Sequence, residues 1–285
     1  QGDVGYDCLA GARCWAVGAM TTVANAIIAL LKGYGVDTVF GIPGVHTIEL
    51  YRGIVDSGLR HVTPRHEQGA GFMADGYARS TGKPGVCFLI SGPGLTNALT
   101  AIAQAYSDSV PMLIISAVHK RKDIGLGRGF LHELPAQREL MSQVTAFSHT
   151  IMDPGSLREV LGRAFAVFGS ARPRPVHIEI PIDLMDAPYS GLLEQIIVPA
   201  VPYPDPRAIA QAAALLADAR APTIIVGGGA AGAGGVLLET AELLDAPVVL
   251  TTAAKGVLRA DHPLCLGSTI RRQEIRDLFA DYVAK

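Results

Sequence analysis

The chain is poor in several residue types that mark particular classes of protein. Only four of its 285 residues are cysteine, with no C-x-x-C spacing, which argues against a disulfide framework and predicts a reduced, cytoplasmic setting. The 24 Lys and Arg nearly balance the 26 Asp and Glu, so the net charge is −2 and we expect no nucleic-acid partner. No uninterrupted apolar run reaches the roughly 18 residues of a membrane-spanning helix, so we expect no membrane segment either.

What the chain does contain is enough apolar material for a folded core. Hydrophobic residues make up 49% of the sequence, and a length of 285 residues predicts two domains. From residue 22 to residue 180, segments with helical apolar spacing alternate with short, continuously apolar runs such as 86–90 and 112–115. Continuous runs are typical of strands covered on both faces. The sequence therefore predicts an α/β fold with a doubly wound parallel sheet.

Changes in composition suggest where the domains begin and end. Prolines concentrate toward the end of 183–206, which we interpret as a linker, and a second α/β pattern starts after it. The first twenty residues are weakly patterned. The predicted organisation is an extension outside the fold (1–20), a first domain (21–182), a linker (183–206) and a second, incomplete α/β domain (207–285).

A glycine-rich turn in the second domain allows two interpretations. Gly227, Gly229 and Gly232 have the spacing of a dinucleotide-binding turn between a strand and a helix. That function also needs an acidic residue at the end of the next strand, where 251–255 contains none. We therefore favour tight strand-to-helix packing over nucleotide binding.

Three turns in the first domain carry the most informative motifs. They are the segments 41–44 (Gly-Ile-Pro-Gly), 65–70 (Arg-His-Glu-Gln-Gly-Ala) and 91–97 (Ser-Gly-Pro-Gly-Leu-Thr-Asn). Each follows a predicted strand, and parallel sheets bind ligands at the carboxyl ends of their strands. With the stretch from His66 to Arg79 and the segment 172–181, these turns resemble the thiamine-diphosphate enzymes of the acetohydroxyacid synthase and 2-oxo acid decarboxylase superfamily.

The resemblance implies a catalytic role for Glu67 in a pyrimidine-binding domain. In this family a glutamate hydrogen-bonds a ring nitrogen of the cofactor's aminopyrimidine, which promotes removal of the thiazolium C2 proton. The ylid then attacks a 2-oxo acid, and the thiazolium accepts the electrons left by carbon dioxide. A glutamate in the first turn of a helix commonly only complements the helix dipole, and the surrounding motif favours the catalytic interpretation here.

Five further residues resemble family positions that lie against the aminopyrimidine. Proline and glycine also punctuate ordinary strand-to-helix turns, and Asn97 could cap the helix that follows, so a structural role stays open for each. The predicted cofactor-binding residues, besides Glu67, are Pro43, Gly44, Pro93, Gly94 and Asn97.

The loop 118–135 bears on the substrate. Acetohydroxyacid synthases usually carry Gly-Gln after the strand and Phe-Gln-Glu later in the loop, whereas this chain has Ala117-Val118 and Leu131-His132-Glu133. The loop looks more like that of decarboxylases acting on guanidino-oxo acids such as 2-ketoarginine, with a pyruvate-condensing acetolactate synthase as the alternative. We predict that His132 transfers protons during the reaction and that Glu133 pairs with a cationic substrate tail. The alternative is that both residues belong to a surface loop without a catalytic or binding role.

Other family features are missing or altered. Members hold Mg²⁺ and the diphosphate through Gly-Asp-Gly followed by an asparagine, and this chain has no Gly-Asp-Gly, so we expect the diphosphate-binding domain to be absent and the metal site to lie elsewhere. Arg172 matches a position that contacts FAD in members that carry it, although the altered loop does not favour FAD. The resemblance implies a homodimer or homotetramer, or a second chain that supplies the missing domain. The other alternative is a non-catalytic remnant, and in either case we expect weak cofactor binding by this chain alone.

Overall fold

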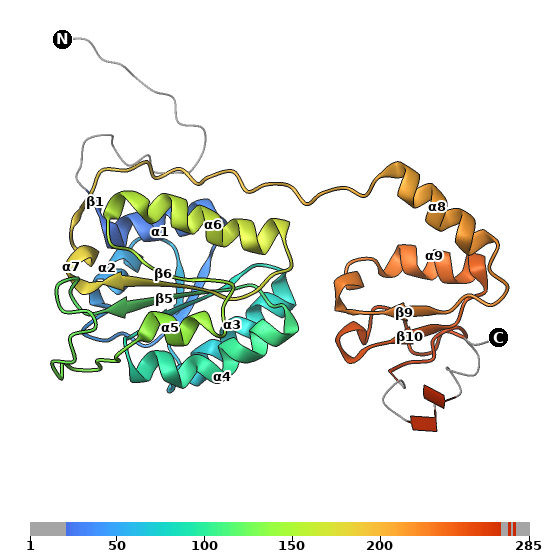
Figure 1. Cartoon of the computed structure of the whole chain (residues 1–285), viewed down its shortest axis with the longest axis horizontal. Coiled ribbons are helices and arrows are strands. Elements are labelled where there is room, and N and C mark those ends of the chain that lie inside the picture. Colours follow the sequence, from blue (N-terminus) through green and yellow to red (C-terminus); the bar gives the residue numbers. More distant parts are fainter. Residues whose placement is uncertain (1–20, 269–272, 275, 278–285) are drawn as a thin grey trace, which may run out of the picture. The chain divides into compact units, whose positions relative to one another are not determined.

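A computed structural model describes residues 21–268, 273–274 and 276–277, and the predicted extension 1–20 lies outside the described residues (Figure 1). The chain divides into two compact units between Pro202 and Tyr203. Each unit is described by itself below.

A six-stranded sheet forms the centre of the first unit. Its strand order is β3-β2-β4-β5-β7-β6, and all neighbouring strands are parallel. The strands are β2 (Thr38–Gly41), β3 (Arg60–Val62), β4 (Gly85–Leu89), β5 (Met112–Val118), β6 (Ser148–Thr150) and β7 (Val176–Pro181). Every residue of β2, β4, β5 and β7 is buried, as expected for strands covered on both faces.

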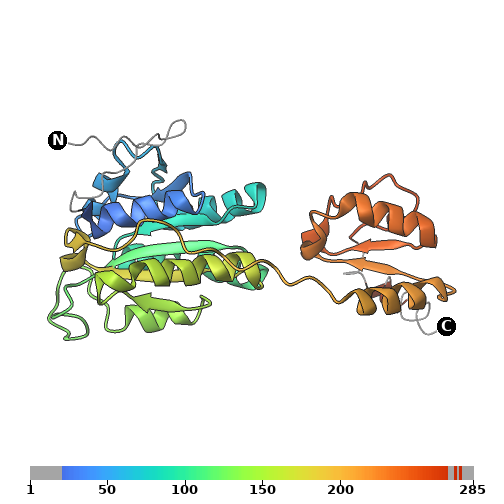
Figure 2. The ribbon, with the colours of Figure 1, turned by 90° about the horizontal axis from the view of Figure 1, so that it is seen from above.

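Helices cover both faces of this sheet, which confirms the predicted doubly wound α/β fold. They are α1 (Val23–Gly33), α2 (Ile48–Ile54), α3 (Glu67–Thr81), α4 (Pro93–Asp108), α5 (Gln137–Ser142), α6 (Leu157–Ser170) and α7 (Ile182–Met185), with a 3-10 turn η1 (Pro154–Ser156) before α6. Helices α1 and α6 lie side by side on one face, and α3, α4 and α5 lie on the other (Figures 1 and 2). Alternate residues of β5 enter the two cores: Leu113 and Ile115 pack with the α1 side, Met112 and Ile114 with the α3 side.

Local sequence signals fix where α3 begins and ends. At its start, Nδ1 of the His66 ring accepts a hydrogen bond from the Gln68 N–H, in the manner of an N-cap. At its end, Gly82 takes a left-handed conformation with φ of 73°, which favours glycine. Glu67 is therefore the first residue of the helix, at the carboxyl edge of the sheet.

The segment predicted as a linker (183–206) is in large part packed onto the first unit. Strand β8 (Pro188–Tyr189) pairs antiparallel with β1 (Thr21–Thr22), and Tyr189 is buried. Further along, the Ile196 N–H donates to the Tyr34 hydroxyl. Despite its prolines, this segment is not a free linker, because apolar side chains and one short strand pairing hold it against α1 and α6. The first unit accordingly continues to Pro202.

The second unit is a small α/β layer. Two parallel strands, β9 (Ile224–Val226) and β10 (Val248–Leu250), pair at its centre. Its helices are α8 (Pro206–Ala217) and α9 (Gly234–Leu244), with 3-10 turns η2 (Gly228–Ala230) and η3 (Thr252–Ala254). In the glycine-rich turn, a Cβ built on Gly228 would lie 3.2 Å from Ala253 Cβ, so this turn packs closely against η3.

Candidate active site

The segments that follow β2 and β4 pack against one side chain, that of Ile90. A Cβ built on Gly44 would lie 2.6 Å from Ile90 Cδ1, and one built on Gly94 would lie 2.3 Å from Ile90 Cγ2. Both loops therefore approach Ile90 as closely as a residue without a side chain allows. Pro43 and Pro93 each precede one of these glycines, and Pro93 opens α4. The structure thus brings four of the predicted residues to one place at the carboxyl edge of the sheet.

Glu67, the first residue of α3 after β3, lies next to Gly94. Its Oε2 accepts a hydrogen bond of 2.9 Å from Asn97 Nδ2 on α4, and its side chain is half-buried. No donor among the described residues bonds its Oε1, and a Cβ on Gly94 would come within 3.5 Å of that oxygen. The arrangement leaves one carboxylate oxygen as an available acceptor next to Gly94.

The floor next to Glu67 is apolar and holds two groups that stay neutral. The Tyr51 hydroxyl donates to the Phe88 carbonyl oxygen at 3.2 Å, and burial raises the pKa of Tyr51 well above its ordinary value, with Cys87 and Glu67 adding to the effect. Burial also raises the pKa of the Cys87 thiol to about 12. Neither group carries a charge near neutral pH.

Three histidine rings gather beside the turn that contains Gly92. The His46 ring lies edge-on to those of His119 and His132, with centroids 5.5 and 5.8 Å away. His46 Nδ1 is 2.7 Å from Ser91 Oγ, and its pKa is lowered by burial and by the two neighbouring rings. The Nδ1 atom of His132 is buried and has no hydrogen-bond partner among the described residues. Of the three, only His132 was a predicted site residue. His119 lies in the same loop as His132, and His46 comes from the segment between β2 and α2.

Glu133 is directed into its own loop. Its carboxylate accepts hydrogen bonds from the N–H groups of Arg128, Gly129 and Phe130, at 3.3, 2.7 and 3.0 Å. Burial acts to raise the pKa of this carboxyl, but the N–H groups outweigh it and hold the pKa below its ordinary value. The predicted role in pairing with a substrate cation stays a prediction, and the contacts present organise the loop that carries His132.

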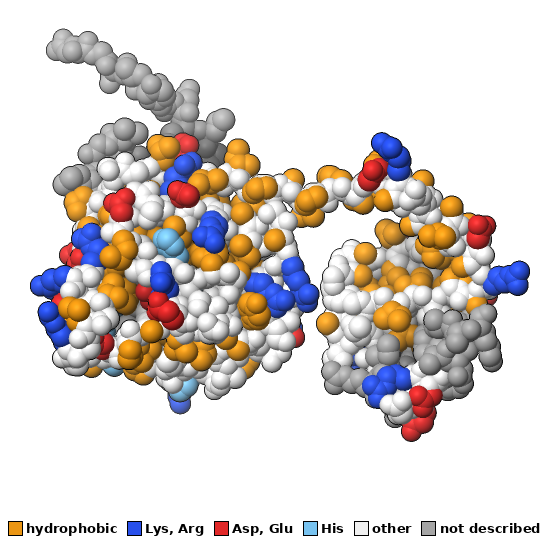
Figure 3. All heavy atoms as spheres, viewed as in Figure 1, with side chains coloured by type: hydrophobic (Ala, Val, Ile, Leu, Met, Phe, Trp, Pro, Cys, Tyr) orange, Lys and Arg blue, Asp and Glu red, His pale blue; other side chains and the backbone are white. Residues whose placement is uncertain are grey.

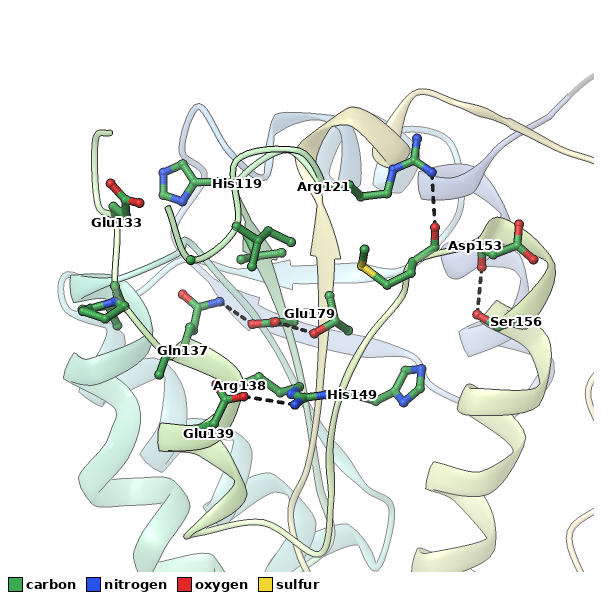
Figure 4. A pocket seen from close by; sticks show the side chains of 18 residues that line it. His119, Arg121, Glu133, Gln137, Arg138, Glu139, His149, Asp153, Ser156 and Glu179 are labelled. Carbon is green, nitrogen blue, oxygen red and sulfur yellow. Dashed lines mark hydrogen bonds and ion pairs between the residues drawn. The ribbon is translucent and has the colours of Figure 1, made fainter. Parts of the chain in front are cut away.

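A cavity of about 690 Å³ opens near the ends of β5, β6 and β7 (Figure 4). Its charged lining includes Arg121 and Arg138, which are paired with Asp183 and Glu139 respectively. On its inner side Glu179 is 2% exposed, and burial raises the pKa of this carboxyl. Gln137 of α5 lies beside it, as the close-up shows.

Sequence reasoning missed this polar pair. A signal was present, because Glu179 interrupts the apolar sequence of a buried strand, as does His177 two residues earlier. Gln137 had no such signal, since α5 is six residues long and stands in a segment without apolar periodicity.

Comparisons with known proteins show the family to which this chain belongs. Residues 21–140 match the model of the N-terminal thiamine pyrophosphate (TPP) binding domain of thiamine pyrophosphate enzymes, and residues 209–280 match the model of their central domain. The chain belongs to the thiamine pyrophosphate enzyme family. Glu67, Asn97 and the two glycine turns all lie within the N-terminal TPP binding domain.

Individual members of the thiamine pyrophosphate enzyme family are similar over most of this chain. It is 53% identical over 251 residues to a probable 2-ketoarginine decarboxylase of Pseudomonas aeruginosa, covering 87% of this chain and 45% of that protein. It is 38% identical over 255 residues to a probable acetolactate synthase large subunit of Methanocaldococcus jannaschii, covering 86% and 42%. A crystal structure from Mycobacterium smegmatis, described as thiamin diphosphate-dependent, matches with a TM-score of 0.77 at 28% identity, covering 87% of this chain and 48% of that one. The chain thus spans about half the length of these relatives.

Arg172 lies away from the residues that surround Glu67. It precedes β7, at the amino edge of the sheet, while Glu67 is at the carboxyl edge. Its Nε donates to Ser109 Oγ at 2.6 Å, and the residue is exposed. The structure therefore separates the predicted FAD contact from the other predicted site residues.

Two structural features are absent from the described residues. Within them, no group of three or more His, Cys, Asp or Glu is placed to hold a metal ion. No helix in the described part of the chain has the length and apolar character needed to cross a membrane. On the face seen in Figure 3, acidic and basic side chains of the first unit are interspersed.

Proposed function

We propose that this chain forms the pyrimidine-binding portion of a thiamine-diphosphate-dependent 2-oxo acid decarboxylase. The observation that carries the proposal is the state of Glu67: one oxygen is fixed by Asn97, and the other has no donor among the described residues and lies next to Gly94. With a proton at Oε1, this carboxyl group would donate a hydrogen bond to the ring nitrogen of an aminopyrimidine. When bound, the cofactor supplies an electron sink for the loss of carbon dioxide.

The chain's own residues would act on the pyrimidine end of the cofactor. Glu67 would hold or release a proton at Oε1, while the Asn97 amide keeps the carboxylate oriented through Oε2. Gly44 and Gly94 would let a ring approach, since neither places a side chain over Ile90. Pro43 and Pro93 would fix the backbone of the two loops.

For the substrate, we propose a guanidino-oxo acid such as 2-ketoarginine. The support is the 53% identity to the probable 2-ketoarginine decarboxylase, together with the His132 loop that differs from the synthase pattern. His132 would exchange protons with the substrate, and Glu133 would keep the loop in shape through its three backbone contacts. An acetolactate synthase is the second candidate, supported by the 38% identity to a synthase large subunit.

The remaining parts of the holoenzyme would come from outside this sequence. We propose that Mg²⁺ and the diphosphate are bound by a Gly-Asp-Gly segment, which the 285 residues do not contain. We propose that the chain works as a homodimer or homotetramer, or together with a second chain that supplies the Gly-Asp-Gly segment. FAD has no support beyond the position of Arg172, and a cytoplasmic location rests on the few cysteines.

Turnover of the chain supplied with the family's diphosphate-binding domain tests the proposal. Carbon dioxide release and acetolactate formation are measured with 2-ketoarginine and with pyruvate. Replacing Glu67 by glutamine should lower turnover by about 100-fold or more, the range of general acid-base catalysis. Glu49→Gln is the matched control. Glu49 is ion-paired with Arg52 on α2, and its replacement should leave turnover unchanged. Unchanged turnover in Glu67→Gln would refute the site, and acetolactate formation from pyruvate alone would refute the substrate.

A further inference from the structure

Gln137 connects the cavity to the turn beside Glu67. It is the first residue of α5 and is 5% exposed. Its Oε1 accepts a hydrogen bond of 2.9 Å from the Gly92 N–H, across 45 residues of sequence. Its Nε2 donates to the Ala117 carbonyl oxygen and to Glu179 Oε2, each at 2.9 Å. One side chain therefore joins the ends of β4, β5 and β7.

These contacts leave the Gln137 amide one orientation. A carbonyl oxygen and a carboxylate only accept hydrogen bonds, so the end that meets Ala117 and Glu179 must be the NH₂ group. The oxygen is then directed to Gly92. Glu179 is itself fixed, because its Oε1 accepts from the Thr150 hydroxyl at 2.6 Å. The contacts with Ala117 and Glu179 therefore fix the amide group that accepts from Gly92.

The turn at Gly92 has little freedom to settle elsewhere. Gly92 has φ of 65°, a conformation that favours glycine, and a Cβ there would lie 2.3 Å from the His132 carbonyl oxygen. Two residues later, Gly94 lies against Ile90 and faces Glu67 Oε1. A shift of the Gly92 backbone would therefore move both the His132 loop and the Gly94 backbone beside Glu67.

We propose that Gln137 is a positioning residue, which holds the Gly92 turn so that Gly94 and His132 stay in place around the aminopyrimidine site. Gln137 makes no contact with Glu67 and acts through the backbone of the turn. The inference rests on the proposed function for the identity of the ligand, but the anchoring of Gly92 can be tested without it.

The first measurement is amide hydrogen exchange of the 285-residue chain, followed by NMR. In Gln137→Met, exchange at Gly92 should be at least about tenfold faster than in the unaltered chain, because a buried hydrogen bond is removed. Thr150→Val is the matched control: it also removes one donor from Glu179 but leaves the Gly92 contact, so exchange at Gly92 should change less than about threefold. Gln137→Asn, which keeps the amide but is too short to reach Gly92, serves if the Met variant does not fold.

The second measurement is titration with thiamine diphosphate of the chain supplied with the family's diphosphate-binding domain, read from the amide signals of Gly94 and Asn97. The dissociation constant should rise by about tenfold or more in Gln137→Met and by less than about threefold in Thr150→Val. Unchanged exchange and unchanged binding in the Gln137 variants would overturn the positioning role. Absence of any response to the cofactor in the unaltered chain would instead count against the proposed function, and the exchange at Gly92 would still decide the role of Gln137.

Discussion

The buried histidine of β7 should make the first unit lose stability when the pH falls below 7. His177 is fully buried, with Nε2 2.8 Å from Ser116 Oγ and Nδ1 2.7 Å from Ser148 Oγ. Burial lowers its pKa from 6.5 to about 3. The ring is therefore neutral in the native state at pH values where the unfolded chain would bind a proton.

The sign and size of the effect follow from proton linkage. The unfolded state binds more protons than the native state between the two pKa values, so the free energy of unfolding falls as the pH falls through that window. Full stability is present above pH 6.5, and the slope is about 1.4 kcal/mol per pH unit. From pH 7 to pH 5 the contribution of His177 is a loss of about 2 kcal/mol. Glu179, whose pKa is raised by burial, acts in the opposite direction, so a comparison with a variant is needed.

Urea unfolding at several pH values measures this loss. Amide NMR signals of β5 and β7 report on the first unit alone, which matters because the chain has two compact units. His177→Gln should be less stable at pH 7, but its unfolding free energy should fall by about 2 kcal/mol less between pH 7 and pH 5. Equal pH dependence in the two proteins, or an imidazole that titrates above pH 5 in the native chain, would refute the reasoning.

Two glycines and a loop glutamate give further tests. Gly94→Ala should destabilise the first unit by about 1–3 kcal/mol in urea unfolding, because the new methyl group displaces Ile90. Gly76 is at an exposed position of α3 with nothing within 4 Å of a new Cβ, so Gly76→Ala should stabilise the first unit by about 0.5–1 kcal/mol. A stabilising Gly94→Ala together with a destabilising Gly76→Ala would contradict the packing. Glu133→Ala should speed amide exchange at Gly129 with little change in global stability, and protection that survives would show that another group holds the loop.

Sequence periodicity predicted the long elements well, since their burial is set by residues close together in the chain. Helix α1 begins at Val23, next to residue 22 where the helical apolar spacing starts, and the apolar runs at 86–90 and 112–115 correspond to β4 and β5. The elements that were missed, α5 and β6, have six and three residues, too few to show a period. Their positions depend on contacts with β7 and not on their own composition.

The candidate site was predictable to the extent that its residues follow strand ends. The convergence of Gly44, Glu67 and Gly94 follows from parallel strands whose carboxyl ends share one edge. The direction of a loop side chain does not follow from such a rule. Glu133 bonds its own backbone, and Gln137 reaches a glycine 45 residues away, because local turn geometry and long-range packing decide those contacts.

The strand order of the first unit has a consequence for how the protein folds. All six strands are parallel, so no two neighbours are joined by a hairpin and each pairing must await a crossover connection. Gly44, Glu67 and Gly94 come from three different crossovers, and they meet only after β2 has paired with both β3 and β4. Such non-local pairing is slow to form. Partly folded chains should therefore lack the site altogether. Cofactor added during refolding would bind only to domains that have finished folding, and it would not speed up their folding.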